Sequence, residues 1–248
     1  MYFEAHDDTG KMAAAKLATL LSDDIKVSPL VLDGKNAAEK TDFIRKFTRF
    51  LDEQKAGFKC VYIDASESEG NRIAMMSFLA DLAQNLPEKD REAFYRAAEC
   101  LMRLVSEEKE LLNNYLRRKS LNSLVKAVSD AKMEALLKKH LEAQRNIRII
   151  RDILEKYTAD TPVLVFIDGL DICTADFVVK ILIAIDIVFR VNNMQFVLLA
   201  DMGHLSGSVS SFYGASVNPA AYLERMTGFC LKFGPSVSKE DDLLARQS

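Results

Sequence analysis

Apolar residues recur along this chain in two patterns, continuous runs and helical spacing. Five runs predict short β-strands, at residues 27–33, 60–65, 162–168, 195–201 and 229–233. The third and fourth are apolar without alternation and end in aspartate, which is typical of strands buried on both faces. Apolar residues spaced by three or four predict helices at about residues 12–21, from residue 40 until Gly57, and at 177–189.

The order of these segments predicts a parallel sheet. The helix between the first two strands fits a crossover connection, which joins parallel strands and is nearly always right-handed. Residues 73–157 contain one proline and are rich in Leu, Ala, Lys, Glu and Arg, so they predict several helices. We therefore expect an α/β fold, a P-loop-like parallel sheet flanked by helices with an all-helical insertion.

The domain boundaries follow from this order of segments. The expected parts are a first half of the sheet domain at 1–84, the insertion at 85–157, a second half at 158–235 and a flexible tail at 236–248. In the insertion, two leucine and isoleucine stripes favour internal packing over a partner-binding face: Leu136, Leu137 and Leu141, then Ile147, Ile150 and Leu154.

Composition and charge limit the classes of partner that the sequence predicts. The 248 residues are 49% hydrophobic, enough for a large core, and the net charge of −3 does not favour a nucleic-acid-binding surface. The basic run 117–119 is most simply a solvated surface. The longest apolar stretch, 177–191, contains three charged residues and is too short to span a bilayer. The first eight residues are acidic, whereas a secretory signal begins with basic residues and continues with an apolar segment, so we expect a cytoplasmic protein.

The four cysteines lie far apart, without the spacing of a zinc or redox motif. We expect them to be reduced and mostly buried.

A phosphate-binding pattern lies between the first strand and the following helix. In a P-loop, Gly-x4-Gly-Lys-Ser/Thr, backbone amides surround the phosphates, the lysine reaches the β/γ oxygens and the hydroxyl binds Mg²⁺. Gly34, Lys40 and Thr41 occupy the first, seventh and eighth positions, but the sixth is Glu39. Its bulk and negative charge oppose a polyphosphate unless the side chain points outward. Taken alone, the pattern also fits a loop glycine before an ordinary helix.

A second feature supports a nucleotide site. Asp168 ends a buried strand, as the Mg²⁺-organising aspartate of a Walker B motif does. Many ATPases place a second acid directly after it to polarise the attacking water, but this chain has Gly169. Asp171 could take that role, or it could belong to the N-cap region of the next helix.

The chain resembles the KAP family of P-loop NTPases. The resemblance is carried by residues 166–173 (FIDGLDIC), similar to that family's apolar run followed by Asp-Asp-Leu-Asp-Arg-Cys. Residues 196–201 (FVLLAD), 212–214 (FYG), 222–225 (YLER) and the opening 8–21 also agree in order and spacing. The family's P-loop usually reads Gly-x-x-Gly-x-Gly-Lys-Thr/Ser. The resemblance therefore implies phosphate contacts by Gly34, Lys40 and Thr41, and Mg²⁺ contacts by Thr41 and Asp168.

The sequence departs from the family pattern at the catalytic edge. Ala37 and Glu39 replace two P-loop glycines, Gly169 replaces the second acid, and Ile172 replaces the arginine before the cysteine. Met202 also stands where the family often has an arginine. Members often carry membrane-spanning helices in the insertion, but this insertion is too highly charged.

Two functions remain open. One is an ATP- and Mg²⁺-dependent switch with slow hydrolysis, in which Asp171, Asp201 or a partner subunit orients water and Arg225 stabilises charge near the γ-phosphate. The other, which we favour, is a pseudo-NTPase that serves as a protein–protein interaction module in a hetero- or homo-oligomer. The family resemblance implies a setting in phage exclusion or defence.

Overall fold

The computed structural model describes residues 8–22, 28–53, 56–70, 80, 82–107 and 130–233. A five-stranded sheet lies at its centre, and its neighbouring strands all pair in parallel. The strands are β1 (Leu30–Asp33), β2 (Lys59–Asp64), β3 (Val163–Asp168), β4 (Met194–Ala200) and β5 (Phe229–Lys232), in the spatial order β2-β3-β4-β1-β5. Since parallel strands end at one edge, the segments after β1, β3 and β4 gather at the same carboxyl edge.

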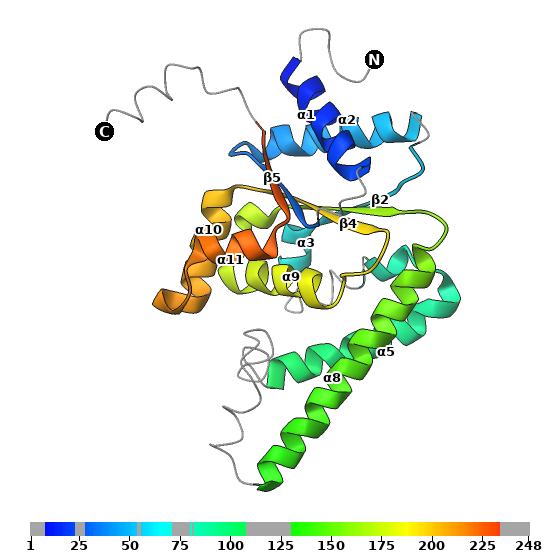
Figure 1. Ribbon diagram of the computed structural model, residues 1–248, viewed down its shortest axis with the longest axis vertical. Helices are drawn as coiled ribbons and strands as arrows, with labels where there is room; N and C mark the ends of the chain where they lie inside the picture. Colours follow the sequence, from blue (N-terminus) through cyan, green and yellow to red (C-terminus); the bar gives the residue numbers. More distant parts are fainter. Residues whose placement is uncertain are drawn as a thin grey trace.

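Helices cover both faces of the sheet, as Figure 1 shows. α1 (Asp8–Ser22) and α2 (Ala37–Glu53) lie above it in that view, whereas α9 (Ala175–Ile187), α10 (Met202–Tyr213) and α11 (Pro219–Met226) lie below. The short α3 (Ala65–Gly70) follows β2 directly, and two 3₁₀ turns, η1 (Leu170–Ile172) and η2 (Gly214–Ser216), follow β3 and α10. The predicted parallel α/β fold is confirmed.

Alternation along the strands gives each face its own core. In β3, Leu164 and Phe166 pack with α1 and α2, while Val165 and Ile167 pack with the helices of the other face. All six β3 residues are buried. This two-sided burial explains why the run carried no polar alternation in the sequence.

Two long helices extend from the sheet as a pair. α5 (Glu88–Glu107) packs against α8 (Asp130–Tyr157), and both project away below the sheet (Figure 1). The near ends join the lower core through Phe94 of α5 and through Ile150 and Leu154 of α8. The packing interpretation of the second stripe, with Ile147, is therefore confirmed.

Other expectations about the insertion and tail meet different outcomes. Leu141 is 63% exposed, so the packing interpretation is wrong there. The side chains of Leu136 and Leu137, the basic run 117–119 and the tail 236–248 lie outside the described residues. The proposed insertion boundaries stay a prediction.

The first turn of α2 and the cysteines need correction. The expected loop at 34–38 is shorter, because α2 begins at Ala37 rather than at about Lys40. All four cysteines are free, but only Cys173 is buried. Among the described helices, none is long and apolar enough to cross a membrane.

Candidate functional site

The loop between β1 and α2 consists of Gly34, Lys35 and Asn36. The Gly34 amide donates to the Ala200 carbonyl at 3.3 Å, and the Phe233 amide donates to the Asp33 carbonyl at 2.6 Å. A Cβ on residue 34 would lie 2.7 Å from the Phe233 carbonyl oxygen. Glycine is thus required here by the close approach of the segment that follows β5, independently of any phosphate.

Asn36 and Glu39 cap the first turn of α2. The Glu39 amide donates to Asn36 Oδ1 at 3.3 Å, and Asn36 Nδ2 donates back to Glu39 Oε1 at 2.8 Å. This reciprocal arrangement resembles a capping box, which stabilises a helix start. The Lys40 amide donates to the Asn36 carbonyl at 3.2 Å, so helical bonding already includes Lys40. The cap is the physical reason that α2 begins early, and it engages amides that a P-loop would direct at phosphate.

Lys40, Asp171 and Asp201 form what we call the lysine corner. The Lys40 side chain is completely buried, and its Nζ lies 2.7 Å from Asp171 Oδ2. The other Asp171 oxygen accepts the Asp201 amide at 2.7 Å. The Asp201 carboxylate in turn caps α10 by accepting the His204 amide at 2.9 Å. The P-loop lysine is therefore held in an internal ion pair.

The position of Asp171 settles one of its two interpretations. It lies in η1, and the N-cap of α9 is Thr174, so the assignment of Asp171 to the N-cap region is wrong. Both of its oxygens already accept hydrogen bonds, one from an ammonium group and one from an amide.

Thr41, Asp168 and Tyr62 form the threonine corner. The Thr41 hydroxyl contacts Asp168 Oδ2 and also lies 3.0 Å from the Ala37 carbonyl oxygen. Tyr62 on β2 donates its hydroxyl to the same Asp168 Oδ2 at 2.6 Å, and the Gly169 amide donates to Oδ1 at 2.8 Å. Asp168 is 5% exposed, so these three donors satisfy a buried carboxylate.

The sequence analysis did not identify Tyr62 as a site residue. Its pKa is raised, first by burial and then by its hydrogen bond to Asp168, so the hydroxyl keeps its proton at neutral pH. Tyr62 is level with Phe166 in the parallel β2–β3 register, two residues before the paired Asp64 and Asp168. Only this register brings the tyrosine to the carboxyl edge.

Gly169 connects the two corners in a conformation that favours glycine. Its φ is +75°, in the left-handed region, and an added Cβ would lie 2.6 Å from Asp64 Oδ1 and 3.1 Å from the Ser66 amide. Asp64 Oδ1 accepts hydrogen bonds from the amide and hydroxyl of Ser66 at 2.9 and 2.6 Å. The position of the missing second acid is therefore sterically committed to glycine.

Strand-ending aspartates are a general feature of this edge. Asp33 accepts the Met202 amide at 2.9 Å, and Asp64, Asp168 and Asp201 each accept at least one backbone amide as well.

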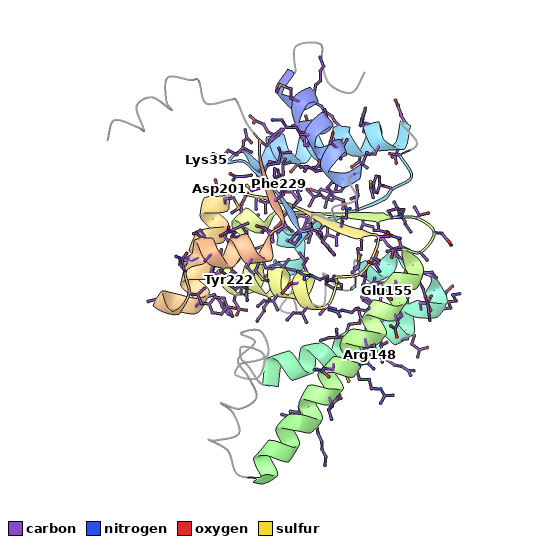
Figure 2. The ribbon with its side chains drawn as sticks, in the orientation of Figure 1. Lys35, Arg148, Glu155, Asp201, Tyr222 and Phe229 are labelled. Carbon is purple, nitrogen blue, oxygen red and sulfur yellow. The ribbon has the colours of Figure 1, made fainter. Side chains whose placement is uncertain are left out.

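Figure 2 shows Lys35 and Asp201 at this end of the sheet, whereas Glu155 and Arg148 lie on the projecting α8. Among the described residues, no group of three or more His, Cys, Asp or Glu side chains is arranged to hold a metal ion.

Arg225 lies apart from the other candidates. It is exposed in the last turn of α11, with its guanidinium 5.5 Å from the centre of the Tyr222 ring. The Gly228 amide, three residues later, donates to the Pro29 carbonyl before β1 at 2.8 Å. The chain just after Arg225 therefore reaches the amino edge of the sheet, while Lys40, Thr41 and Asp168 meet at the carboxyl edge. Figure 2 shows Tyr222 in the lower helical layer.

Comparison with protein families identifies the framework around these corners. The model of the KAP family P-loop domain matches residues 11–241. The chain belongs to this family. The resemblance carried by the strand ends and the segments after β4 is thus confirmed, and the KAP P-loop fold is that of a nucleotide-binding domain.

The other comparisons add little to this assignment. No match is found among the curated proteins. One similar solved structure is the ORC2 protein of Aeropyrum pernix, described as ADPNP-ADP complexes, with 13% sequence identity and a TM-score of 0.38. The match covers 96% of this KAP domain and 49% of that chain, so the domain spans about half the length of that protein.

The side chains that would hold Mg²⁺–nucleotide already have internal partners in this KAP domain. Thr41 and Asp168 offer oxygen ligands of the type that Mg²⁺ prefers. However, hydroxyl and amide donors already engage both Asp168 oxygens, and Asp171 engages the Lys40 ammonium. The capped first turn of α2 also engages the amides of Glu39 and Lys40. A bound nucleotide would have to displace these internal partners.

Proposed function

We propose that this KAP-family domain is a pseudo-NTPase, a P-loop fold that binds Mg-ATP weakly or not at all and serves as a protein–protein interaction module. The observation that carries the proposal is the fully buried Lys40 with Asp171 at 2.7 Å. Breaking a buried pair leaves an uncompensated charge, which is strongly unfavourable. A phosphate that recruited Lys40 would have to offset this loss.

The charge around Lys40 supports the same conclusion. Asp33, Asp168, Asp171 and Asp201 gather at the carboxyl edge, and their carboxylates accept backbone amides or the Lys40 ammonium. Lys40 is already neutralised by its own pair, so an approaching polyphosphate would meet an excess of negative charge. Repulsion of like charges in a partly buried site is only partly screened by water.

Loss of hydrolysis follows from the residues that would have to activate water. A general base needs a free lone pair directed at the water. Gly169 has no side chain, and Asp171 is held in place by one internal donor on each oxygen, the Lys40 ammonium and the Asp201 amide, so only its remaining lone pairs could accept from a water. The chain just after Arg225 reaches the other edge of the sheet, so we propose no charge-stabilising role for this arginine within one chain.

We further propose that the domain acts as one subunit of a larger protein complex. A P-loop framework with an intact core and an internally satisfied site suits a subunit that contacts other protein subunits or a second copy. The kinship with KAP proteins supports a place in a cytoplasmic phage-exclusion or defence complex.

An active, slow ATPase is the second candidate, because Lys40, Thr41 and Asp168 still converge at one edge. In that case the Lys40–Asp171 pair would be the closed state of a switch, which nucleotide opens.

Thermal unfolding with and without Mg-ATP separates the two candidates. A ligand present at 100 times its Kd stabilises the folded state by about 2.7 kcal/mol. We expect no shift at millimolar Mg-ATP in the wild type. Lys40→Met and Lys35→Met are the matched pair, a buried and an exposed lysine of the same region.

A stabilisation that Lys40→Met removes and Lys35→Met retains would contradict the pseudo-NTPase proposal. Phosphate release above the background of Asp168→Ala would then establish hydrolysis.

A further inference from the structure

Tyr62 makes a contact that neither the P-loop pattern nor the lysine corner explains. Its hydroxyl lies 2.6 Å from Asp168 Oδ2, the same oxygen that Thr41 contacts. A Thr41–Asp168 contact alone leaves an acceptor position on this oxygen, because a carboxylate oxygen has two lone pairs. Tyr62 takes the second position, and Gly169 donates to the other oxygen.

A hydroxyl in this place donates the same kind of hydrogen bond as a water bound to a cation. Mg²⁺ in P-loop sites keeps several waters and is held by one or two carboxylates together with substrate phosphates. Those waters donate hydrogen bonds, as the phenol of Tyr62 does. The phenol gives the buried carboxylate a hydrogen-bond donor without bringing a positive charge. A cation that coordinated Asp168 directly would instead need a free lone pair on the carboxylate oxygen.

The placement of Tyr62 is rigid enough for this role. Tyr62 is on β2, which pairs with β3 over six residues from Lys59↔Val163 to Asp64↔Asp168. Tyr62 is 44% exposed as a residue and Asp168 is 5% exposed, so the tyrosine is the more accessible of the two. A divalent cation at Asp168 Oδ2 would therefore have to compete with the tyrosine hydroxyl.

We propose that Tyr62 is a specificity-determining residue that disfavours a divalent cation held jointly by Thr41 and Asp168, because its hydroxyl takes the second lone pair of Asp168 Oδ2, the oxygen beside Thr41. This inference rests on the proposed function, because it names the group that makes the threonine corner independent of metal. It also makes a prediction about this chain alone: removing the Tyr62 hydroxyl frees a lone pair of Asp168 Oδ2 and raises the affinity of this corner for a divalent cation.

The test uses Mn²⁺ as the probe and omits nucleotide. Free Mn²⁺ gives a six-line electron paramagnetic resonance signal that falls on binding, and Mn²⁺ suits the oxygen ligands that Mg²⁺ uses. We expect Tyr62→Phe to bind one Mn²⁺ at least about tenfold more tightly than the wild type, since a competing hydrogen bond to a charged group is lost. The gain should disappear in Tyr62→Phe/Asp168→Asn.

Tyr95→Phe is the matched control, because Tyr95 is an exposed tyrosine of similar accessibility on α5. It should bind Mn²⁺ as the wild type does. Circular dichroism checks folding, and Tyr62→Leu, with the same expectation, replaces Tyr62→Phe if that variant does not fold.

Equal Mn²⁺ binding by the wild type and a folded Tyr62 variant would overturn the inference, and so would a gain that persists without Asp168. These outcomes are independent of the proposed function. That proposal fails if the wild type is stabilised by Mg-ATP through Lys40, whatever the Mn²⁺ result is.

Discussion

The lysine corner and the threonine corner start from neighbouring residues of α2 but are stabilised differently. Lys40 is completely buried and is neutralised by one carboxylate, Asp171, at 2.7 Å. At Asp168, by contrast, a buried carboxylate is satisfied by neutral hydroxyl and amide donors. The buried Lys40 ammonium depends on a single opposite charge. The buried Asp168 carboxylate is stabilised by three separate donors. Single substitutions should therefore be far more damaging at the lysine corner.

Asp171→Asn gives the largest expected effect. It keeps the shape of the side chain but leaves the Lys40 ammonium buried without a counter-charge. Removing one partner of a buried pair costs about 3–5 kcal/mol, and the 20% exposure of Asp171 places the expected loss near the lower end, about 3 kcal/mol. Urea unfolding measures it. Thr41→Val, the counterpart at the other corner, should lose only about 1.5 kcal/mol because two donors to Asp168 remain.

A double-mutant cycle sharpens this comparison. Lys40→Met should lose less than Asp171→Asn, because the Asp171 carboxylate is partly exposed and still accepts the Asp201 amide. Lys40→Met/Asp171→Asn should recover stability relative to Asp171→Asn alone. If the two single losses simply added, or if Thr41→Val were as damaging as Asp171→Asn, the distinction between the corners would be wrong.

Gly169→Asp tests two features together, the positive-φ conformation of residue 169 between the two corners and the proposed loss of hydrolysis. It restores the acid that many P-loop ATPases place after the Walker B aspartate. However, residue 169 has φ +75°, and a Cβ there would meet Asp64 Oδ1 at 2.6 Å. Backbone strain of this type costs about 1–3 kcal/mol, so we expect a loss of about 2 kcal/mol in urea unfolding and no phosphate release.

The matched control for Gly169→Asp is Gly57→Asp. Gly57 also has a positive φ, +74°, but an added Cβ would meet nothing within 4 Å. It should show the conformational loss without the collision. A stable Gly169→Asp variant that hydrolyses ATP would show that glycine at this position, rather than the site as a whole, prevents turnover.

The framework was predictable because buried parallel strands leave a local signal. Residues 163–167 of β3 and 196–200 of β4 are apolar without interruption, and each run is followed by an aspartate, Asp168 or Asp201. Parallel pairing then places Lys40, Thr41 and Asp168 at one edge without knowledge of any side-chain contact. This much of the candidate site follows from spacing and topology alone.

The contacts that decide the chemistry were not predictable in the same way. Tyr62 reaches Asp168, 106 positions later in the sequence, only through the pairing of β2 with β3. The amino-edge approach of the chain just after Arg225 depends on where β5 pairs, through Gly228 and Pro29. The early start of α2 did have a local signal, since Asn followed three residues later by Glu is typical of a capped helix start. The P-loop pattern over the same residues favoured a longer loop.

Asn36→Ala carries the smallest expected loss and asks whether the cap keeps the loop short. Replacing an asparagine N-cap costs about 1 kcal/mol, and the first turn of α2 should fray toward a longer loop. Asn218→Ala is the matched control, because Asn218 caps α11 by accepting the Ala221 amide at 3.1 Å. Both variants should lose similar stability in urea, but only Asn36→Ala should speed hydrogen exchange at the amides of Glu39 and Lys40. Unchanged exchange there would mean that the Lys40–Asp171 pair alone fixes this turn. The lysine corner would then control the phosphate-binding loop as well as its own charge.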